Sequence, residues 1–140
     1  MSAEAGLLLD THIWLWLISG SAELNNKTVK LLDGAAKEGK LFVPEIAVWE
    51  LATLTAKKRL TLGMPIKNWV QEAIQKPGIE MTPLSWEISI ESTMLPGVLH
   101  ADPADRIIIA TARIKKYSLV TRDEKIQKYS QQGHLLVIKA

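Results

Sequence analysis

The stretch LLLDTHIWLWL, from Leu7 to Leu17, joins two apolar segments through a single carboxylate. Residues 7–9 have the length and continuous apolar character of a buried strand, and residues 11–18 form a helix-sized apolar segment that ends before Gly20. Asp10 stands at the junction, where an Asp is a preferred helix N-cap. The same position also suits a binding site at a strand end. Choosing between these two roles requires the other residues of the chain.

Short strands and helices alternate along the remainder of the chain. Pro44 is expected to begin one of the helices, because Pro is favoured at the first helical position. Further strands are predicted at 41–43, 79–81, 118–121 and 135–138, and helices at 25–37, 45–59, 66–75, 85–94, 103–115 and, as a short segment, after Asp123.

The strands are continuous apolar runs, which is typical of a parallel sheet covered by helices on both faces. The pattern therefore predicts an α/β fold, specifically a three-layer α/β/α sandwich with a central, mostly parallel sheet of about five strands. A chain of 140 residues without linkers or repeats fits a single domain over 1–140.

Composition narrows the possible chemistry. Apolar residues make up 47% of the chain and charged residues 23%, which is typical of a globular protein. The absence of cysteine excludes disulfides, thiolate zinc sites and cysteine nucleophiles, and three histidines argue against a histidine-rich metal site. Any metal would be held by oxygen ligands, which favours Mg²⁺ or Mn²⁺. A net charge of +2 is compatible with a nucleic-acid partner without demanding one.

The first residues, MSAEAG, contain no basic segment, and Asp10 and His12 interrupt the apolar stretch that follows. We therefore expect neither a signal peptide nor a transmembrane helix, and by default a cytoplasmic protein.

Two candidate site residues follow strands directly. Ligands of a parallel sheet bind beyond the carboxyl ends of its strands. Asp10 follows the first strand, and Asp123 follows the strand over 118–121, after Thr121. Each Asp can instead be an N-cap that stabilises its helix by about 1 kcal/mol. Both roles can coexist, because a carboxylate has two oxygens.

Two further acids lie within predicted helices. Glu50 is the only charged residue between positions 46 and 56, so it is either an expensive buried carboxylate that needs a partner or an exposed side chain of a mostly buried helix. Asp102 before Pro103 is a good N-cap, and it could pair with Arg106. Asp105 falls in the first turn of the helix, where the helix dipole stabilises a negative charge. It also shares a helix face with apolar residues and is therefore the better site candidate.

Asp10, Glu50, Asp105 and Asp123 are thus expected to converge, and their mutual repulsion would be severe without a counter-charge. A divalent cation would resolve that repulsion, activate a water and offset charge on a phosphoryl group. One cause then explains all four acids.

The order of the motifs LLLDTH, AVWELA, HADPADRIIIATA and LVTRDEKI resembles PIN-domain ribonucleases, and most closely the VapC-type toxins of bacterial toxin–antitoxin pairs. The resemblance implies an endoribonuclease that depends on Mg²⁺ or Mn²⁺, is commonly a homodimer, and is blocked by a cognate antitoxin. It assigns catalysis and metal binding to the same four acids, with Thr121 as the hydroxyl before the last one. This chain departs from the family at Ala47, where many relatives have a small hydroxyl residue, and at Ala104, where an aromatic is usual.

Other residues are expected to surround this site. Asp102, His100, Arg106 and Arg122 are candidates for supporting the acids or positioning RNA, and the remaining candidate phosphate contacts are Lys57, Lys58, Arg59, Arg113 and Lys125. His12 is expected on a helix surface. One of Trp14 and Trp16 is expected in the core and the other at a protein interface, whereas Trp49, Trp69 and Trp86 are expected in the core or at its edge.

Two other functions fit parts of the pattern. A receiver-like domain would also bind Mg²⁺ in an acidic crevice, but no lysine stands at a strand end to pair with a phosphorylated Asp. A catalytically inactive PIN fold would bind a partner only, although none of the four acids is missing. The identity of the RNA, of the antitoxin and the number of metals stay open at this stage.

Overall fold

The computed structural model describes residues 5–140, with five strands in one sheet. The strand order is β3-β2-β1-β4-β5, and every pair of neighbours is parallel, which confirms the predicted α/β fold. The strands are β1 (Leu7–Leu9), β2 (Leu41–Pro44), β3 (Ile79–Thr82), β4 (Ser118–Thr121) and β5 (Val137–Lys139).

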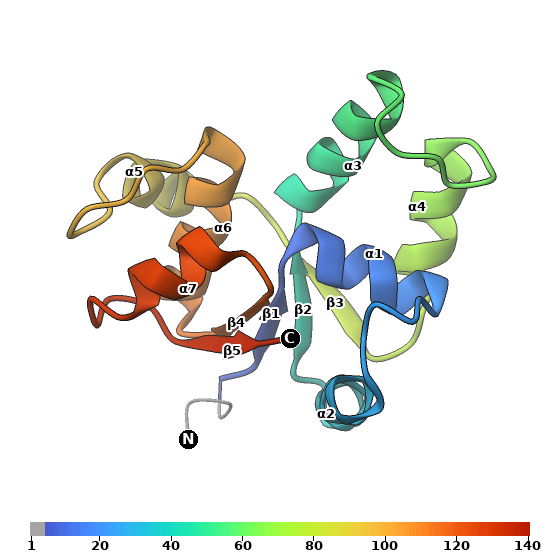
Figure 1. Ribbon diagram of the computed structural model, residues 1–140, viewed down its shortest axis with the longest axis horizontal. Coiled ribbons are helices and arrows are strands. Elements are labelled where there is room, and N and C mark those ends of the chain that lie inside the picture. Colours follow the sequence, from blue (N-terminus) through green and yellow to red (C-terminus); the bar gives the residue numbers. More distant parts are fainter. Residues whose placement is uncertain (1–4) are drawn as a thin grey trace.

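Seven helices connect these strands within the described residues (Figure 1). Side chains cap the amino-terminal ends of two of them: Asn25 accepts a hydrogen bond from the Thr28 amide at 2.8 Å, and Ser85 accepts one from the Ile88 amide at 3.2 Å. The helices are α1 (Thr11–Ser19), α2 (Asn26–Lys37), α3 (Ile46–Ala56), α4 (Ile66–Ile74), α5 (Trp86–Thr93), α6 (Pro103–Lys115) and α7 (Glu124–Ser130).

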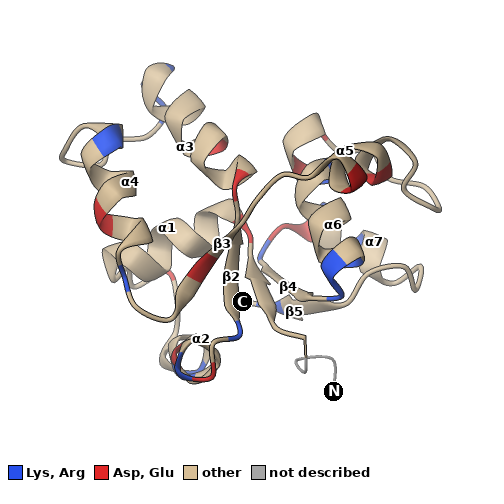
Figure 2. Ribbon diagram, turned by 180° about the vertical axis from the view of Figure 1, so that it is seen from behind, with Lys and Arg blue, Asp and Glu red and all other residues tan. Residues whose placement is uncertain are grey.

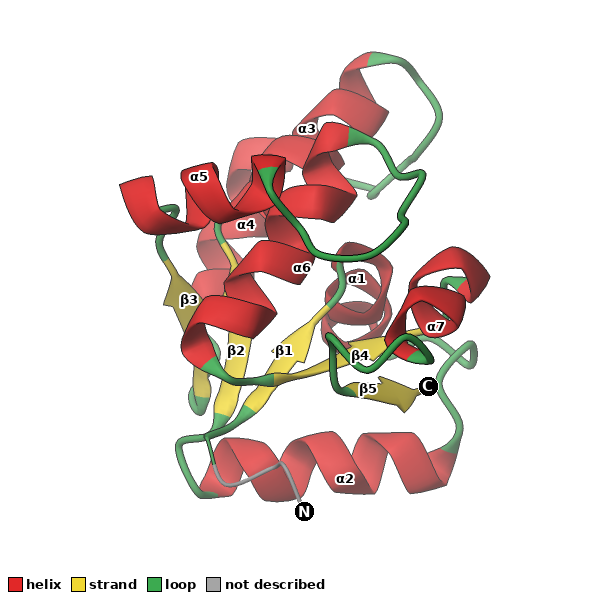
Figure 3. Cartoon of the chain, turned by 90° about the vertical axis from the view of Figure 1, so that its left-hand side faces the viewer, coloured by secondary structure: helices red, strands yellow, loops and turns green. Residues whose placement is uncertain are grey.

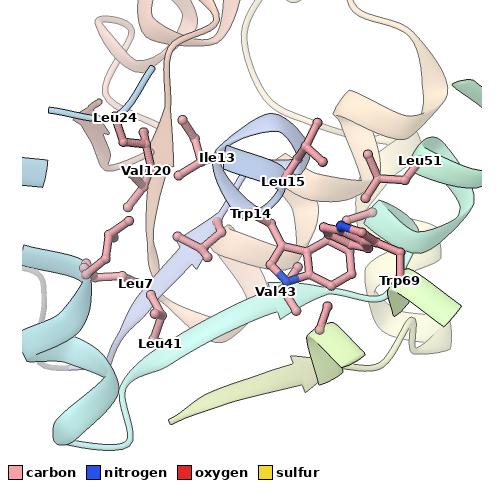
Figure 4. Close-up of a cluster of buried hydrophobic side chains, with 14 residues drawn as sticks. Leu7, Ile13, Trp14, Leu15, Leu24, Leu41, Val43, Leu51, Trp69 and Val120 are labelled. Carbon is pink, nitrogen blue, oxygen red and sulfur yellow. The ribbon is translucent and has the colours of Figure 1, made fainter. Parts of the chain in front are cut away.

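The alternation of side chains along β1 creates two apolar layers. Leu7 and Leu9 pack on one face of the sheet with α1, α2, α3 and α4, and Leu8 packs on the other face with α6 and α7. Figures 1 and 3 show the sheet between these two groups of helices. The first layer includes Trp14, whose ring lies edge-on to Trp69 at 5.1 Å between centroids (Figure 4). The chain is therefore a three-layer α/β/α sandwich.

Two predictions about β2 and α3 were wrong in detail. Pro44 ends β2 instead of beginning the helix. The ladder with β3 tolerates the missing N–H because its last hydrogen bond is donated by the Glu45 amide to the Thr82 carbonyl, at 2.9 Å. The helix α3 ends at Ala56 and not at Arg59, because Lys58 takes a left-handed conformation with φ 57°.

The tryptophans divide differently from the prediction. Trp14 and Trp69 are buried, as expected. Trp16 is half-buried, and its place at a protein interface stays a prediction. Trp49 and Trp86, which were expected at the core, are instead 58% and 71% exposed. Residues of α3 on either side of Trp49, such as Ala47 and Leu51, face the core, so the apolar composition of this helix hid which side is outermost.

The strand order also decides one alternative. A receiver-like sheet has the order 2-1-3-4-5, whereas β1 here lies between β2 and β4. The receiver-like alternative is therefore excluded by topology.

No helix among residues 5–140 is both long and apolar enough to cross a membrane. The expectation that the chain lacks a signal peptide rests largely on residues 1–4, which lie outside the described residues.

Candidate metal centre

Three carboxylates from three different elements meet beyond the carboxyl end of β1. Asp10 follows β1, Glu50 lies in α3, and Asp105 lies in the first turn of α6. One oxygen of each lies within 4.8 Å of the others. Figure 2 colours acidic positions red, and some of them lie on α3 and on the chain between α3 and α6. The direction of chain progression reverses between β1 and β4, and such a switch point is where open α/β sheets bind ligands.

Asp10 has the two roles that the sequence left open. Its Oδ1 accepts a hydrogen bond from the Thr11 amide at 2.8 Å, which caps α1. Its Oδ2 accepts a hydrogen bond from the Thr121 hydroxyl at 2.6 Å. The buried Thr121 also accepts a hydrogen bond from the Asp123 amide at 3.0 Å, so one hydroxyl orients both strand-end acids.

Thr11 is a site residue that the sequence reasoning did not select. Its hydroxyl donates to Glu50 Oε1 at 2.5 Å, and its side chain is only 2% exposed. This contact explains how α3 can carry a half-buried carboxylate, because a buried acid needs a hydrogen-bond donor. The only signal in the sequence was the hydroxyl residue directly after Asp10, and nothing local indicated a partner 39 positions away.

Asp105 is the one acid of the three whose carboxylate accepts no hydrogen bond among the described residues. Its backbone amide donates to Asp102 Oδ1 at 2.9 Å, which confirms Asp102 as the N-cap of α6. Burial, followed by the charges of Asp102, Asp10, Glu50 and Asp123, raises the pKa of Asp105 to about 7.

Burial also raises the pKa values of Asp10 and Glu50. Hydrogen bonds from Thr121 and the Thr11 amide oppose that rise at Asp10, and the Thr11 hydroxyl opposes it at Glu50. The three carboxyls therefore resist being ionised together unless a positive charge joins them. The donor set is all oxygen, and its spacing suits a hard cation such as Mg²⁺, whose opposite ligands are about 4 Å apart.

Asp123 lies beside this cluster and outside the group of three close acids. Its Oδ1 caps α7 by accepting hydrogen bonds from the amides of Lys125 and Ile126 at 2.8 and 3.1 Å. It lines the same depression of about 390 Å³ as Asp10, Glu50 and Asp105. The structure thus brings three of the four predicted acids to one point and places the fourth on the wall.

The model of one protein family matches this chain over residues 7–131, and that family is the PIN domain. The chain belongs to the PIN-domain family. A curated relative, Ribonuclease VapC22 of Mycobacterium tuberculosis (strain ATCC 25618 / H37Rv), is 28% identical over 123 residues, which cover 88% of this chain and 91% of the relative.

Solved structures share the fold of this PIN domain at low sequence identity. VapBC from Salmonella typhimurium, solved bound to DNA, matches with a TM-score of 0.70 and 13% identity over 96% of this chain and 97% of that one. VapBC2 from Rickettsia felis, bound to a promoter DNA fragment, has a TM-score of 0.69 and 16% identity over 95% of this chain and 97% of that chain. FitAcB from Neisseria gonorrhoeae has a TM-score of 0.66 and 22% identity over 94% of this chain and 96% of that chain.

The predicted basic residues of this PIN domain occupy different places. Arg106 does not pair with Asp102: its Nε donates to the Ser92 carbonyl at 2.9 Å, and its Nη1 donates to the Leu99 carbonyl at 3.3 Å. That prediction was wrong because the carbonyls come from a segment that helix spacing cannot reveal. The guanidinium of Arg106 therefore holds the loop before α6 to its own helix.

Arg122 lies at the rim of the acidic depression. Its Nη1 forms an ion pair with Glu23 at 2.9 Å, Nη2 donates to the Glu23 carbonyl, and the guanidinium lies 4.7 Å from the centre of the Trp16 ring. His12 is exposed on α1, as expected, and stacks obliquely on Trp16. These contacts connect Arg122 to α1 and to the segment between α1 and α2.

His100 lines the neighbouring depression, which shares Asp102, Asp105 and Asp123 with the acidic one. Arg113, another predicted phosphate contact, instead forms an ion pair with Glu91 at 2.7 Å. The two family departures, Ala47 and Ala104, are both buried, so each packs in the interior beside a candidate acid.

Proposed function

We propose that this protein is a divalent-metal-dependent endoribonuclease that hydrolyses RNA phosphodiester bonds, with Asp10, Glu50 and Asp105 as ligands of Mg²⁺ or Mn²⁺. The observation that carries the proposal is the approach of these three carboxylates to within 4.8 Å of one another, with an Asp105 pKa near 7. A site that is unstable when fully ionised is stabilised by a cation. The 28% identity to a protein named a ribonuclease supports RNA as the substrate.

The residues of the chain would divide the work. When bound, the metal would supply an activated water and offset the charge on the phosphoryl group. Thr11 and Thr121 hold Glu50 and Asp10 in fixed orientations through their hydroxyls. Asp123 caps α7 through Oδ1, which leaves Oδ2 to orient water at the edge of the site.

We further propose that the protein is the toxin of a toxin–antitoxin pair, neutralised by a cognate antitoxin, homodimeric and cytoplasmic. The similarity in fold to the VapBC and FitAcB structures supports a protein partner. Trp49 and Trp86, at 58% and 71% exposure, give the surface the large aromatic side chains that are enriched at protein interfaces. The shared sheet and its two apolar layers support a single domain over 1–140.

Cleavage of a labelled total RNA pool tests the activity. Purified protein is incubated with Mg²⁺, with Mn²⁺ and with EDTA, beside Asp10→Asn and the matched control Asp33→Asn, which changes an exposed acid of α2. We expect metal-dependent cleavage by wild type and Asp33→Asn and none by Asp10→Asn. Equal cleavage by all three proteins would refute the assignment of Asp10. Salt-sensitive RNA binding without cleavage under any condition would support the binding-only alternative instead.

A further inference from the structure

The loop over residues 95–101, between α5 and α6, is attached to the carboxyl-terminal end of α7 by side-chain hydrogen bonds. The Gln132 amide accepts from the Val98 amide at 3.0 Å and donates to the Val98 carbonyl at 2.7 Å. The buried Tyr129 donates its hydroxyl to the Pro96 carbonyl at 2.6 Å. Figure 1 shows this loop on the same side of the molecule as α7. The loop backbone is therefore bound at Pro96 by Tyr129 of α7 and at Val98 by Gln132, which lies two residues after the end of α7.

Gly97 shows how closely the loop and α7 fit. Its φ of +76° is a left-handed conformation, and a Cβ at this position would lie 2.2 Å from the Gln132 side-chain oxygen. Any side chain at this position would therefore disturb the pair of hydrogen bonds between Gln132 and Val98. The wall that the loop provides is organised before any ligand arrives, which lowers the entropy cost of binding.

A continuous groove runs from the acidic cluster to this wall. The acidic depression shares Asp105 and Asp123 with a second depression of about 860 Å³. The second depression shares His100 and Lys125 with a third, of about 320 Å³, which the loop and α7 enclose. The groove is thus lined by carboxylates at one end and by loop backbone and α7 side chains at the other.

The sign of the charge changes along the groove. Lys125 and Lys128, three positions apart on α7, both line its distal part, and Figure 2 shows basic positions on this helix. Within residues 5–140, neither lysine forms an ion pair with a protein carboxylate. The distal part also presents Val98, an apolar side chain that is 66% exposed. Cations spaced along a groove are what the phosphate backbone of single-stranded nucleic acid binds.

We propose that this groove, between residues 95–101 and α7, binds the sugar–phosphate backbone on one side of the scissile phosphate, with Lys125 and Lys128 contacting successive phosphates. The inference rests on the proposed ribonuclease function and names the path of its substrate. RNA is favoured over an acidic peptide because the groove is continuous with the site where a phosphodiester would react. Gln132 is a positioning residue, since it touches the loop and not the RNA.

Fluorescence anisotropy with a labelled random-sequence RNA of about 12 nucleotides tests the groove, with Ca²⁺ replacing Mg²⁺ to slow cleavage. Binding is measured between about 50 and 200 mM salt for wild type, Lys125→Ala/Lys128→Ala and the control Lys30→Ala/Lys37→Ala. The control removes two exposed lysines of α2, which lies on the opposite face of the sheet from α7. Thermal melting of each variant verifies that it is folded.

We expect the Lys125→Ala/Lys128→Ala variant to bind about fivefold more weakly per lysine at 0.1 M salt, with the slope of log K against log salt reduced by about 1.4. The control should match wild type. Gln132→Ala should weaken binding without changing the salt slope, because it removes no charge.

Equal slopes for the two double variants would overturn the proposed path while leaving the ribonuclease function intact. Absence of RNA binding by wild type, combined with absence of cleavage in Mg²⁺ and Mn²⁺, would instead remove the proposed function itself. The proposal would also be overturned if Lys125→Ala/Lys128→Ala bound RNA as wild type does but no longer bound an acidic peptide that wild type binds. That result would assign the groove to a protein partner.

Discussion

Replacing Asp105 by Asn should stabilise the metal-free protein at alkaline pH, although it removes a proposed metal ligand. The folded protein favours the neutral form of this carboxyl, because burial and four neighbouring acids raise its pKa to about 7. Stability from this group is therefore fully present below about pH 4 and is lost as the pH rises through about 7. Asn keeps the shape of the neutral acid and cannot ionise, so the variant avoids that loss.

The size of the effect follows from the displacement of the pKa. The interval from 3.8 to about 7, at about 1.4 kcal/mol per pH unit, sets a ceiling of about 4 kcal/mol on the cost of ionising Asp105. The side chain is half-buried, and solvent screening reduces this cost. The quantity of interest is the free energy of unfolding of Asp105→Asn minus that of wild type. We expect this difference to be about 1–2 kcal/mol larger at pH 8 than at pH 5.

Urea unfolding in EDTA at pH 5 and pH 8 measures this difference, with Asp33→Asn as the control for loss of an exposed acid. Adding Mn²⁺ at pH 8 should reverse the order, since a cation bound at a hundred times its Kd stabilises wild type by about 2.7 kcal/mol. The same stability difference at both pH values, or destabilisation by Asp105→Asn in EDTA at pH 8, would refute the view that this carboxylate is electrostatically strained.

Three substitutions test other parts of the structure. Thr121→Val preserves shape but leaves Asp10 Oδ2 without its donor, so urea unfolding should show a loss of about 1–3 kcal/mol, and an unchanged midpoint would contradict the contact. Gly97→Ala should lower the free energy of unfolding by about 1–2 kcal/mol, because φ is positive and Gln132 is displaced; thermal melting measures this, and a raised Tm would count against the reasoning. Trp86→Ser should change the free energy of unfolding by less than about 0.5 kcal/mol, since the side chain is 71% exposed, and a loss above 2 kcal/mol would mean that it packs in the isolated protein.

The fold was predictable where local signals agree with the tertiary environment. The three residues of β1 are apolar because both faces of the strand are covered, and Asp10 then marks the turn into α1. Asp102 followed by Pro103 identified the start of α6 for the same reason, because N-cap and first-turn preferences are properties of adjacent residues. Asp10 was selected because it follows a strand, and Glu50 because it is the only charged residue between positions 46 and 56 of an apolar helix.

Contacts between distant segments were not predictable. Thr11 meets Glu50, and Arg106 meets the Ser92 carbonyl, only because α1, α3, α5 and α6 pack as they do. Trp49 was misassigned because hydrophobicity does not reveal which side of an apolar helix is outermost. The separation of Asp123 from the other three acids likewise depends on how α7 leaves β4, which no spacing in the sequence encodes.

The central position of β1 has a consequence for the choice of ion. Leu7, Leu8 and Leu9 are at most 1% exposed, and β1 is paired on both edges, so Asp10 is attached to a fully enclosed strand in the middle of the sheet. Glu50 and Asp105 are carried by helices that contact each other across the opening. One side of the site is therefore fixed, and accommodation of a cation with a larger radius, such as Ca²⁺, has to come from a change in the separation of α3 and α6.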